Sequence, residues 1–142
     1  ASINFTAAEG NPTQLVNGSF VGQFAFLNGT ASLDSTIKFD FLSGNSKVIN
    51  EAKWYQTSSV THGVWRWQWS DDDSAWTNIG ATFTLGGATE QTQTELSGNT
   101  TGYRYYRLLG VSGTMNGNPY ITEIEFSIGI AWKIKWPIAI AL

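Results

Sequence analysis

The chain has no cysteine, a single histidine and only 13% charged residues, and each shortage excludes a class of structure or chemistry. Without cysteine, neither disulfide bonds nor thiolate-bound zinc holds the fold together. The charged fraction is well below the usual quarter, and the net charge is −3 with no cluster of lysine and arginine. We therefore expect no nucleic-acid partner. No apolar run reaches the roughly 18 residues of a membrane helix, so we also expect no membrane span.

Aromatic residues (14%) and many Ser, Thr, Asn and Gly residues take the place of the missing charges. These residue types favour strands and turns over helices with charged faces. Short segments with strand-like alternation, about eight in all, are spread along the 142 residues with turn signals between them. This spacing predicts an all-β fold, an antiparallel jelly-roll β-sandwich of about eight strands with an extended C-terminal β tail.

The other segments are arranged around residues 64–79, which read VWRWQWSDDDSAWTNI. Trp65, Trp67 and Trp69 alternate with polar residues, which is the period-two pattern of a half-buried strand. The polar run 70–74 predicts a turn and a returning strand. We favour core packing of the three indoles over a row of sugar-stacking platforms, because the opposite face is the polar one. For the carboxylates of 71–73, a hairpin tip is favoured over a cation site, because adjacent side chains on a tight turn point in different directions.

Further strands are expected on both sides of this hairpin. The stretch 89–96 is polar and is expected to be an exposed strand, whereas 103–111 is apolar on both faces, as in the middle of a sandwich. The remaining segments are one or two short strands before residue 20, then 20–27, 36–41, 48–55 (a strand or a turn-like segment), 81–85 and 120–126.

Three of these segments resemble a known family. The order WQWSDDDSAWTNIG, YRYYRLLGV and ITEIEF is similar to that of discoidin, or coagulation-factor C-type, domains. These domains belong with the galactose-binding-like jelly rolls and the family 32 carbohydrate-binding modules. A fainter match is AFLNGT, where the family usually has an Asp-Gly turn and this chain has Asn28-Gly29. The resemblance covers residues 24–126 and implies a non-catalytic domain that binds glycans, lipid head groups or proteins through loops at one end.

The resemblance also implies candidate site residues. Family members often hold a structural calcium between the early Asp-Gly loop and a Glu of the last strand, which correspond here to Asn28 and Glu123. Because Asn28 lacks the charge of the usual ligand, we favour the alternative that Glu123 faces solvent or binds a backbone amide. Glycan-binding members use a His, an Arg and an aromatic residue, and the candidates are His62, Arg66 and Trp54. The alternative, which we favour for His62, is an exposed loop residue without a function. Apart from this calcium, we expect no cofactor.

Catalysis receives little support from the sequence. A nucleophile–base pair would have to use His62, and no nucleophile-elbow motif accompanies it. Glu123 and Glu125 share a strand face, whereas the carboxylates of glycoside hydrolases face each other across a cleft. We therefore expect that the chain is not an enzyme.

The alternation of residues 120–126 continues to the last residue, with bulky apolar side chains on every even position from 124 to 142. Strands in single domains usually have 3–10 residues, so we expect a domain over 1–128 and an extended apolar tail over 129–142. The favoured interpretation is that the tail pairs with the sheet of a neighbouring subunit. The alternative is that Gly129 turns the chain and the tail covers its own sandwich. The expected assembly residues are Ile130, Trp132, Ile134, Trp136 and Ile138.

Two functional hypotheses follow. The first is a non-catalytic structural and binding subunit of a larger assembly, such as a capsid decoration or tail/fibre protein on a bacteriophage virion. The Ala1-Ser2 start, which suits loss of an initiator Met, and the absence of cysteine favour this setting. The second is a free-standing glycan-binding module. The expected partners are other subunits through the tail and cell-surface glycan, and the expected location is a virion surface or extracellular.

Overall fold

The computed structural model describes residues 1–21 and 24–129, and this part of the chain is built from strands and one turn of 3-10 helix. The elements are β1 (Ser2–Ile3), β2 (Ala7–Glu9), η1 (Pro12–Val16), β3 (Ala25–Phe26), β4 (Thr36–Asp40), β5 (Val48–Gln56), β6 (Thr61–Ser70), β7 (Thr77–Gly86), β8 (Glu90–Gln93), β9 (Tyr105–Ser112) and β10 (Ile121–Gly129). No helix in these residues is long and apolar enough to span a membrane.

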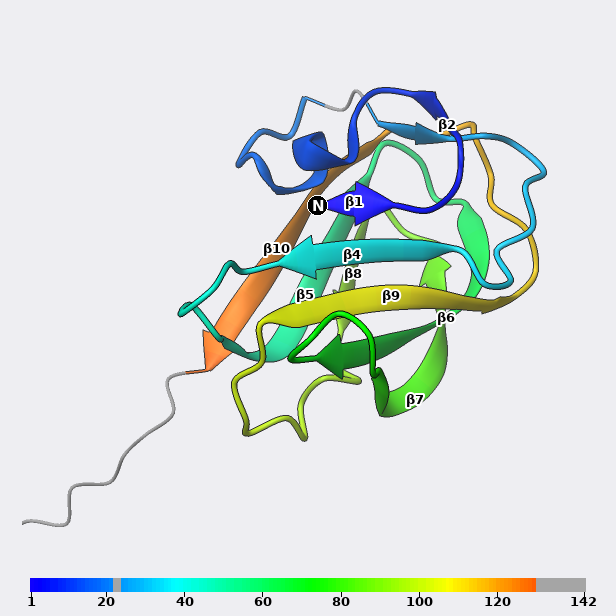
Figure 1. Cartoon of the computed structure of the whole chain (residues 1–142). Coiled ribbons are helices and arrows are strands. Elements are labelled where there is room, and N and C mark those ends of the chain that lie inside the picture. Colours follow the sequence, from blue (N-terminus) through cyan, green and yellow to red (C-terminus); the bar gives the residue numbers. More distant parts are fainter. Residues whose placement is uncertain (22–23, 130–142) are drawn as a thin grey trace, which may run out of the picture.

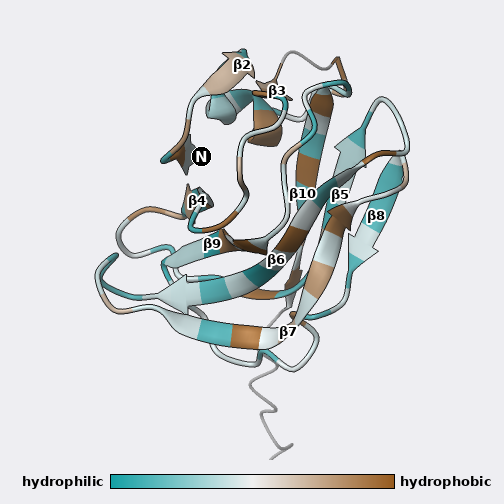
Figure 2. Ribbon diagram, turned by 90° about the vertical axis from the view of Figure 1, so that its right-hand side faces the viewer, coloured by the Kyte–Doolittle hydropathy of each residue, from teal (hydrophilic) through white to brown (hydrophobic). Residues whose placement is uncertain are grey.

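The strands form two main antiparallel sheets that lie against each other as layers (Figure 1). A five-stranded sheet has the order β1-β4-β9-β6-β7, a three-stranded sheet has the order β10-β5-β8, and β2 pairs with β3. Hydrophobic and hydrophilic bands alternate along β7 and β10 (Figure 2), as expected for strands with one face toward a core. The predicted all-β antiparallel sandwich is confirmed.

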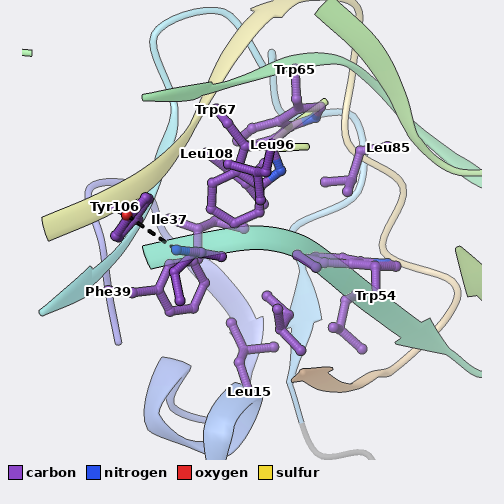
Figure 3. Close-up of a cluster of buried hydrophobic side chains, with 14 of the residues drawn as sticks. Leu15, Ile37, Phe39, Trp54, Trp65, Trp67, Leu85, Leu96, Tyr106 and Leu108 are labelled. Carbon is purple, nitrogen blue, oxygen red and sulfur yellow. Dashed lines mark hydrogen bonds between the residues drawn. The ribbon is translucent and has the colours of Figure 1, made fainter. Parts of the chain in front are cut away.

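The core between the sheets is rich in indoles. Trp54 of β5 and Trp65 and Trp67 of β6 are fully buried in one apolar cluster (Figure 3). The indole N–H of Trp67 donates to Gln93 Oε1 at 2.8 Å, so the polar edge of the ring is satisfied inside the core. The core-packing prediction is confirmed for Trp65 and Trp67. Trp69 is half-buried and packs against the same cluster, so the prediction holds for it in part.

The turn of the central hairpin is held by Asp72. Its Oδ1 accepts the backbone N–H groups of Ser74 (2.8 Å) and Ala75 (2.9 Å), and these bonds lower the pKa of the carboxyl. Asp73 has a φ of 62°, the left-handed conformation that favours glycine. Among the described residues no group of three or more His, Cys, Asp or Glu side chains is placed to hold a metal ion. The acidic run therefore forms a hairpin tip, as favoured from the sequence.

Two segments differ from their predictions. Residues 61–63, expected as a loop, begin β6, and the polar stretch 89–96 forms a strand of only four residues, β8. Gln93 of β8 is buried although its neighbours are polar, because the Trp67 indole needs an acceptor at this position.

Strand β10 lies at one edge of the three-stranded sheet and pairs with β5 as far as Gly129↔Val48. Its described part therefore ends where the predicted tail begins. The tail and its assembly residues Ile130, Trp132, Ile134, Trp136 and Ile138 lie outside the described residues.

Candidate functional site

The ligand site predicted from the sequence is not formed as a surface site. His62 and Trp54 are both fully buried, and their side chains meet at Gln56. Gln56 Oε1 accepts the Trp54 indole N–H at 2.7 Å and lies 3.0 Å from His62 Nε2, and Gln56 Nε2 donates to the carbonyls of Ser58 (2.6 Å) and Val60 (2.7 Å). This set of groups, the Gln56 cluster, is closed to solvent, which argues against contact of His62 or Trp54 with a glycan.

The hydrogen bonds of the Gln56 cluster also fix the protonation of His62. Because the Gln56 amide nitrogen donates to two carbonyls, its oxygen is an acceptor, and His62 Nε2 must carry the proton. His62 Nδ1 then accepts the backbone N–H of Asn116 at 3.3 Å. Burial lowers the pKa of His62 from 6.5 to about 4, so the ring is neutral at pH 7. A neutral, fully bonded imidazole is a structural group.

The favoured prediction of an exposed loop residue is wrong for His62, which lies buried within β6. A register shift lies between Thr61 and Val64, at Gly63, whose φ is 84°. Such a bulge changes the face on which the preceding side chain lies. His62 therefore joins the core, whereas half-buried Arg66 lies beside Leu109 of β9 and away from the Gln56 cluster.

The two predicted calcium ligands have separate partners. Glu123 is buried, and its Oε2 accepts the backbone N–H groups of Gly18 (3.0 Å) and Ser19 (3.2 Å). Burial raises the pKa of Glu123, although these bonds oppose the shift. Asn28 is exposed, and its Oδ1 accepts the N–H of Gly117 at 3.2 Å. The residues do not fit a shared calcium, and the alternative, that Glu123 binds backbone amides, is confirmed.

A different site lies beside the central hairpin, where a pocket of about 480 Å³ opens between β7 and the turn that follows β8. We call it the Trp69–Glu95 pocket. Its lining residues are Trp69, Asn78, Ile79, Gly80, Glu95, Ser97, Gly98 and Asn99. The Trp69 ring stacks on Tyr103 with centroids 3.7 Å apart and an interplanar angle of 10°, so a rigid aromatic surface borders the pocket.

Glu95 gives the pocket its most unusual group. Its Oε2 is buried and has no hydrogen-bond partner among the described residues. Gly80 explains how Glu95 comes so close to β7, because its φ is 61° and a Cβ there would clash with the Glu95 carbonyl oxygen. A buried carboxylate oxygen without a donor is unfavourable, and natural structures contain few of them.

Asn78 of β7 is held by the polar groups on the outer face of the sheet. Arg107 Nε donates to Gln68 Oε1 at 2.7 Å, so the Gln68 amide nitrogen must point the other way, and it donates to Asn78 Oδ1 at 2.8 Å. Because side chains alternate along a strand, the Asn78 amide lies on the face opposite to Trp69, and Asn78 borders the pocket without directing this amide into it. Asn99 is structural instead, since its Nδ2 donates at 2.9 Å both to the Ile49 carbonyl and to the Tyr106 hydroxyl.

The Trp69–Glu95 pocket thus combines an aromatic ring and a carboxylate acceptor. This combination suits a sugar, which presents C–H groups to a ring and hydroxyl groups to polar side chains. Glu95 is the only carboxylate that lines the pocket, so the pair used in glycoside hydrolysis is not present there. Reasoning from the sequence missed Glu95, and it assigned Trp69 to core packing without its position beside a pocket.

Comparisons with known proteins address the fold. No family model and no curated protein matches the chain. Among solved structures, a chitosan-binding module of a chitosanase/glucanase from Paenibacillus sp. IK-5 has a TM-score of 0.61 at 22% identity, over 89% of this chain and 96% of that one. A module of a family 31 glycoside hydrolase from Clostridium perfringens has a TM-score of 0.60 at 14% identity, over 87% and 91%. The module of AlyQ, in complex with 4,5-unsaturated mannuronic acid, has a TM-score of 0.60 at 20% identity, over 89% and 94%.

The chain has the fold of the family 32 carbohydrate-binding modules. The resemblance to the discoidin-like sandwich is therefore confirmed for the fold. Identities of 14–22% do not carry a ligand or its contact residues from those modules to this chain.

Proposed function

We propose that the chain is a non-catalytic glycan-binding module that holds a sugar in the Trp69–Glu95 pocket. The observation that carries this proposal is the Glu95 carboxylate in the lining of a pocket that a rigid aromatic surface borders. Modules of the same fold are described as binding chitosan and as a complex with a mannuronic acid, which supports the class of ligand.

The contacts in the pocket are complementary to a sugar ring. A bound hydroxyl group donates to the Glu95 carboxylate, which lines the pocket. The Trp69 ring covers apolar C–H groups. Because Tyr103 holds Trp69 in place, little side-chain freedom is lost on binding.

A glycan array followed by calorimetric titration tests the proposal. We expect binding by the wild type and a loss of at least tenfold in affinity for Trp69→Ala. Trp76→Ala is the matched control, because Trp76 is also half-buried but lies against Arg107, 4.0 Å from the guanidinium carbon to the ring centroid, and does not line the pocket. Glu95→Gln gives a second variant in which no aromatic packing is removed. A wild-type protein that binds no sugar would end the proposal.

A second function, assembly with other subunits, is favoured by the position of β10. This strand is at a sheet edge, and apart from a bridge between Phe24 and Ile121 its outer side has no strand partner within residues 1–21 and 24–129. We propose that another subunit pairs there or with the segment that follows, which agrees with the alternation over 130–142. An unpaired edge is a ready template for such pairing. That the assembly belongs to a virion surface, such as a capsid decoration or a bacteriophage tail/fibre, stays a prediction, as does an extracellular location.

Truncation after Gly129 tests assembly. The mass in solution, measured by light scattering, should fall from an oligomer to a monomer, while glycan binding persists because the pocket is built from residues 69–99. Equal masses for the truncated and full chains would contradict a role of the tail.

A further inference from the structure

The Trp69–Glu95 pocket carries one negative charge and no compensating positive charge. Glu95 is the only ionisable side chain that lines it. The ion pairs found among the described residues are Lys38–Asp73, Lys53–Glu90 and Arg104–Asp40, and none of them includes Glu95. The pocket therefore has an unmatched charge as well as an unmatched acceptor.

The charge distinguishes among the sugars that the pocket would accept. A neutral hydroxyl satisfies the Glu95 acceptor but leaves its charge uncompensated. An ammonium group supplies up to three donors and the opposite charge, so its Coulomb attraction to the carboxylate adds to the hydrogen bond that a hydroxyl group also makes. A sugar carboxylate is disfavoured, because it would place a second negative charge against Glu95.

We propose that the pocket selects a glycan with a free, protonated amino group, such as a 2-amino-2-deoxyhexose residue, and that the Glu95 carboxylate is its counter-ion. This inference rests on the proposed function, because it names the class of sugar that the same pocket binds. Trp69 covers the apolar side of the ring. N-acetylation removes the charge and adds bulk at the position that faces Glu95, so it weakens binding.

The test is a calorimetric comparison of four oligosaccharides of equal length, built from glucosamine, N-acetylglucosamine, glucose or galacturonic acid. Wild-type protein should bind the glucosamine oligomer about tenfold or more tightly than the acetylated and neutral ones, and the galacturonic acid oligomer most weakly. Glu95→Gln keeps the shape and removes the charge, so the preference for the free amine should disappear while the neutral oligomer is still bound.

Glu51→Gln is the matched control. Glu51 undergoes the same chemical change on β5, outside the pocket, so this variant should keep the wild-type preference. If Glu51→Gln loses the preference as fully as Glu95→Gln, the net charge of −3 attracts cationic sugars in general and the inference is overturned.

The remaining outcomes separate this inference from the proposed function. Equal wild-type affinity for the free and acetylated oligomers would overturn the amine preference and leave glycan binding intact. Absence of binding to all four oligomers, together with an empty glycan array, would overturn the proposed function itself. The wild-type comparison needs no variant, so it decides the matter even if Glu95→Gln does not fold.

Discussion

The Gln56 cluster and the Trp69–Glu95 pocket are both polar sites in one sandwich, and they differ in how completely their hydrogen bonds are made. In the Gln56 cluster, Trp54 and His62 meet a single amide whose other end binds two carbonyls. In the pocket, Glu95 Oε2 is buried without a partner in the described part of the chain.

The difference teaches which residues to regard as functional. His62, Arg66 and Trp54 are the residue types that a glycan site needs, but two of the three are occupied inside the core. Glu95 follows a short polar strand and is not distinctive in the sequence, yet it carries the unmet acceptor. Within residues 1–21 and 24–129, the buried side-chain polar atoms without a hydrogen-bond partner belong to Arg66 and Glu95, and of these two residues Glu95 lines the pocket.

The largest expected effect is a loss of stability when the Gln56 cluster is disrupted. Gln56→Ala should lower the free energy of unfolding by about 2–4 kcal/mol, because the Trp54 indole N–H and the carbonyls of Ser58 and Val60 lose their partner inside the core. Urea titration measures the loss, and glycan affinity of the folded variant should equal that of the wild type. A loss below about 1 kcal/mol would show that the cluster contributes less than its burial implies.

The next effect is a pH dependence of stability that originates in the same cluster. Burial lowers the pKa of His62 from 6.5 to about 4, so the unfolded chain binds a proton more readily than the folded one between these values. The contribution of His62 to the free energy of unfolding is therefore fully present above pH 6.5. It falls by about 1–3 kcal/mol as the pH decreases toward 4.

Denaturant titrations across this pH range on the wild type and on His62→Gln measure the effect. The raised pKa of Glu123 acts with the opposite sign, and it is present in both proteins, so their difference isolates His62. Parallel pH profiles for the two proteins would contradict a neutral, buried His62.

A loss of stability of similar size is expected where the pocket meets β7. Gly80→Ala forces a side chain into the left-handed region and against the Glu95 backbone. This should lower the free energy of unfolding by about 1–3 kcal/mol and should also weaken glycan binding. Gly98→Ala is the control within the same pocket, because a Cβ there meets no atom within 4 Å. Thermal melting compares the two variants, and equal melting temperatures would mean that the contact at Gly80 relaxes freely.

The smallest effect on stability is expected for Glu95→Leu. Removal of an acceptor without a partner should leave the free energy of unfolding unchanged or raise it by up to about 1 kcal/mol, whereas glycan binding is lost. This uncoupling of stability from binding is the reverse of the expectation for Gln56→Ala. A clear destabilisation by Glu95→Leu would show that the carboxylate has a structural role.

The parts of the fold that local pattern determines were predictable from the sequence. The alternation around Trp65 and Trp67 correctly assigned a buried face, and the acidic run 71–73 correctly assigned a turn. Both depend on neighbours along the chain, where the period of two and the turn chemistry are directly visible.

The parts that depend on contacts between distant segments were not predictable. The bulge at Gly63 turns His62 into the core, and the close approach of Gly80 to Glu95 forms the pocket wall. Neither the register of β6 and β7 nor the burial of one carboxylate oxygen follows from residue spacing. The unmatched acceptor of the candidate site therefore became visible only once β7 and the turn after β8 had been placed side by side.

The stack of Trp69 on Tyr103 has a practical consequence. Trp54, Trp65 and Trp67 are sealed in the core, and their emission reports on unfolding rather than on a surface event. Trp69, in contrast, borders the pocket with a phenol ring 3.7 Å from its own. A sugar laid against this pair changes the polarity around the indole, so intrinsic fluorescence becomes an optical reporter of occupancy that needs no attached dye.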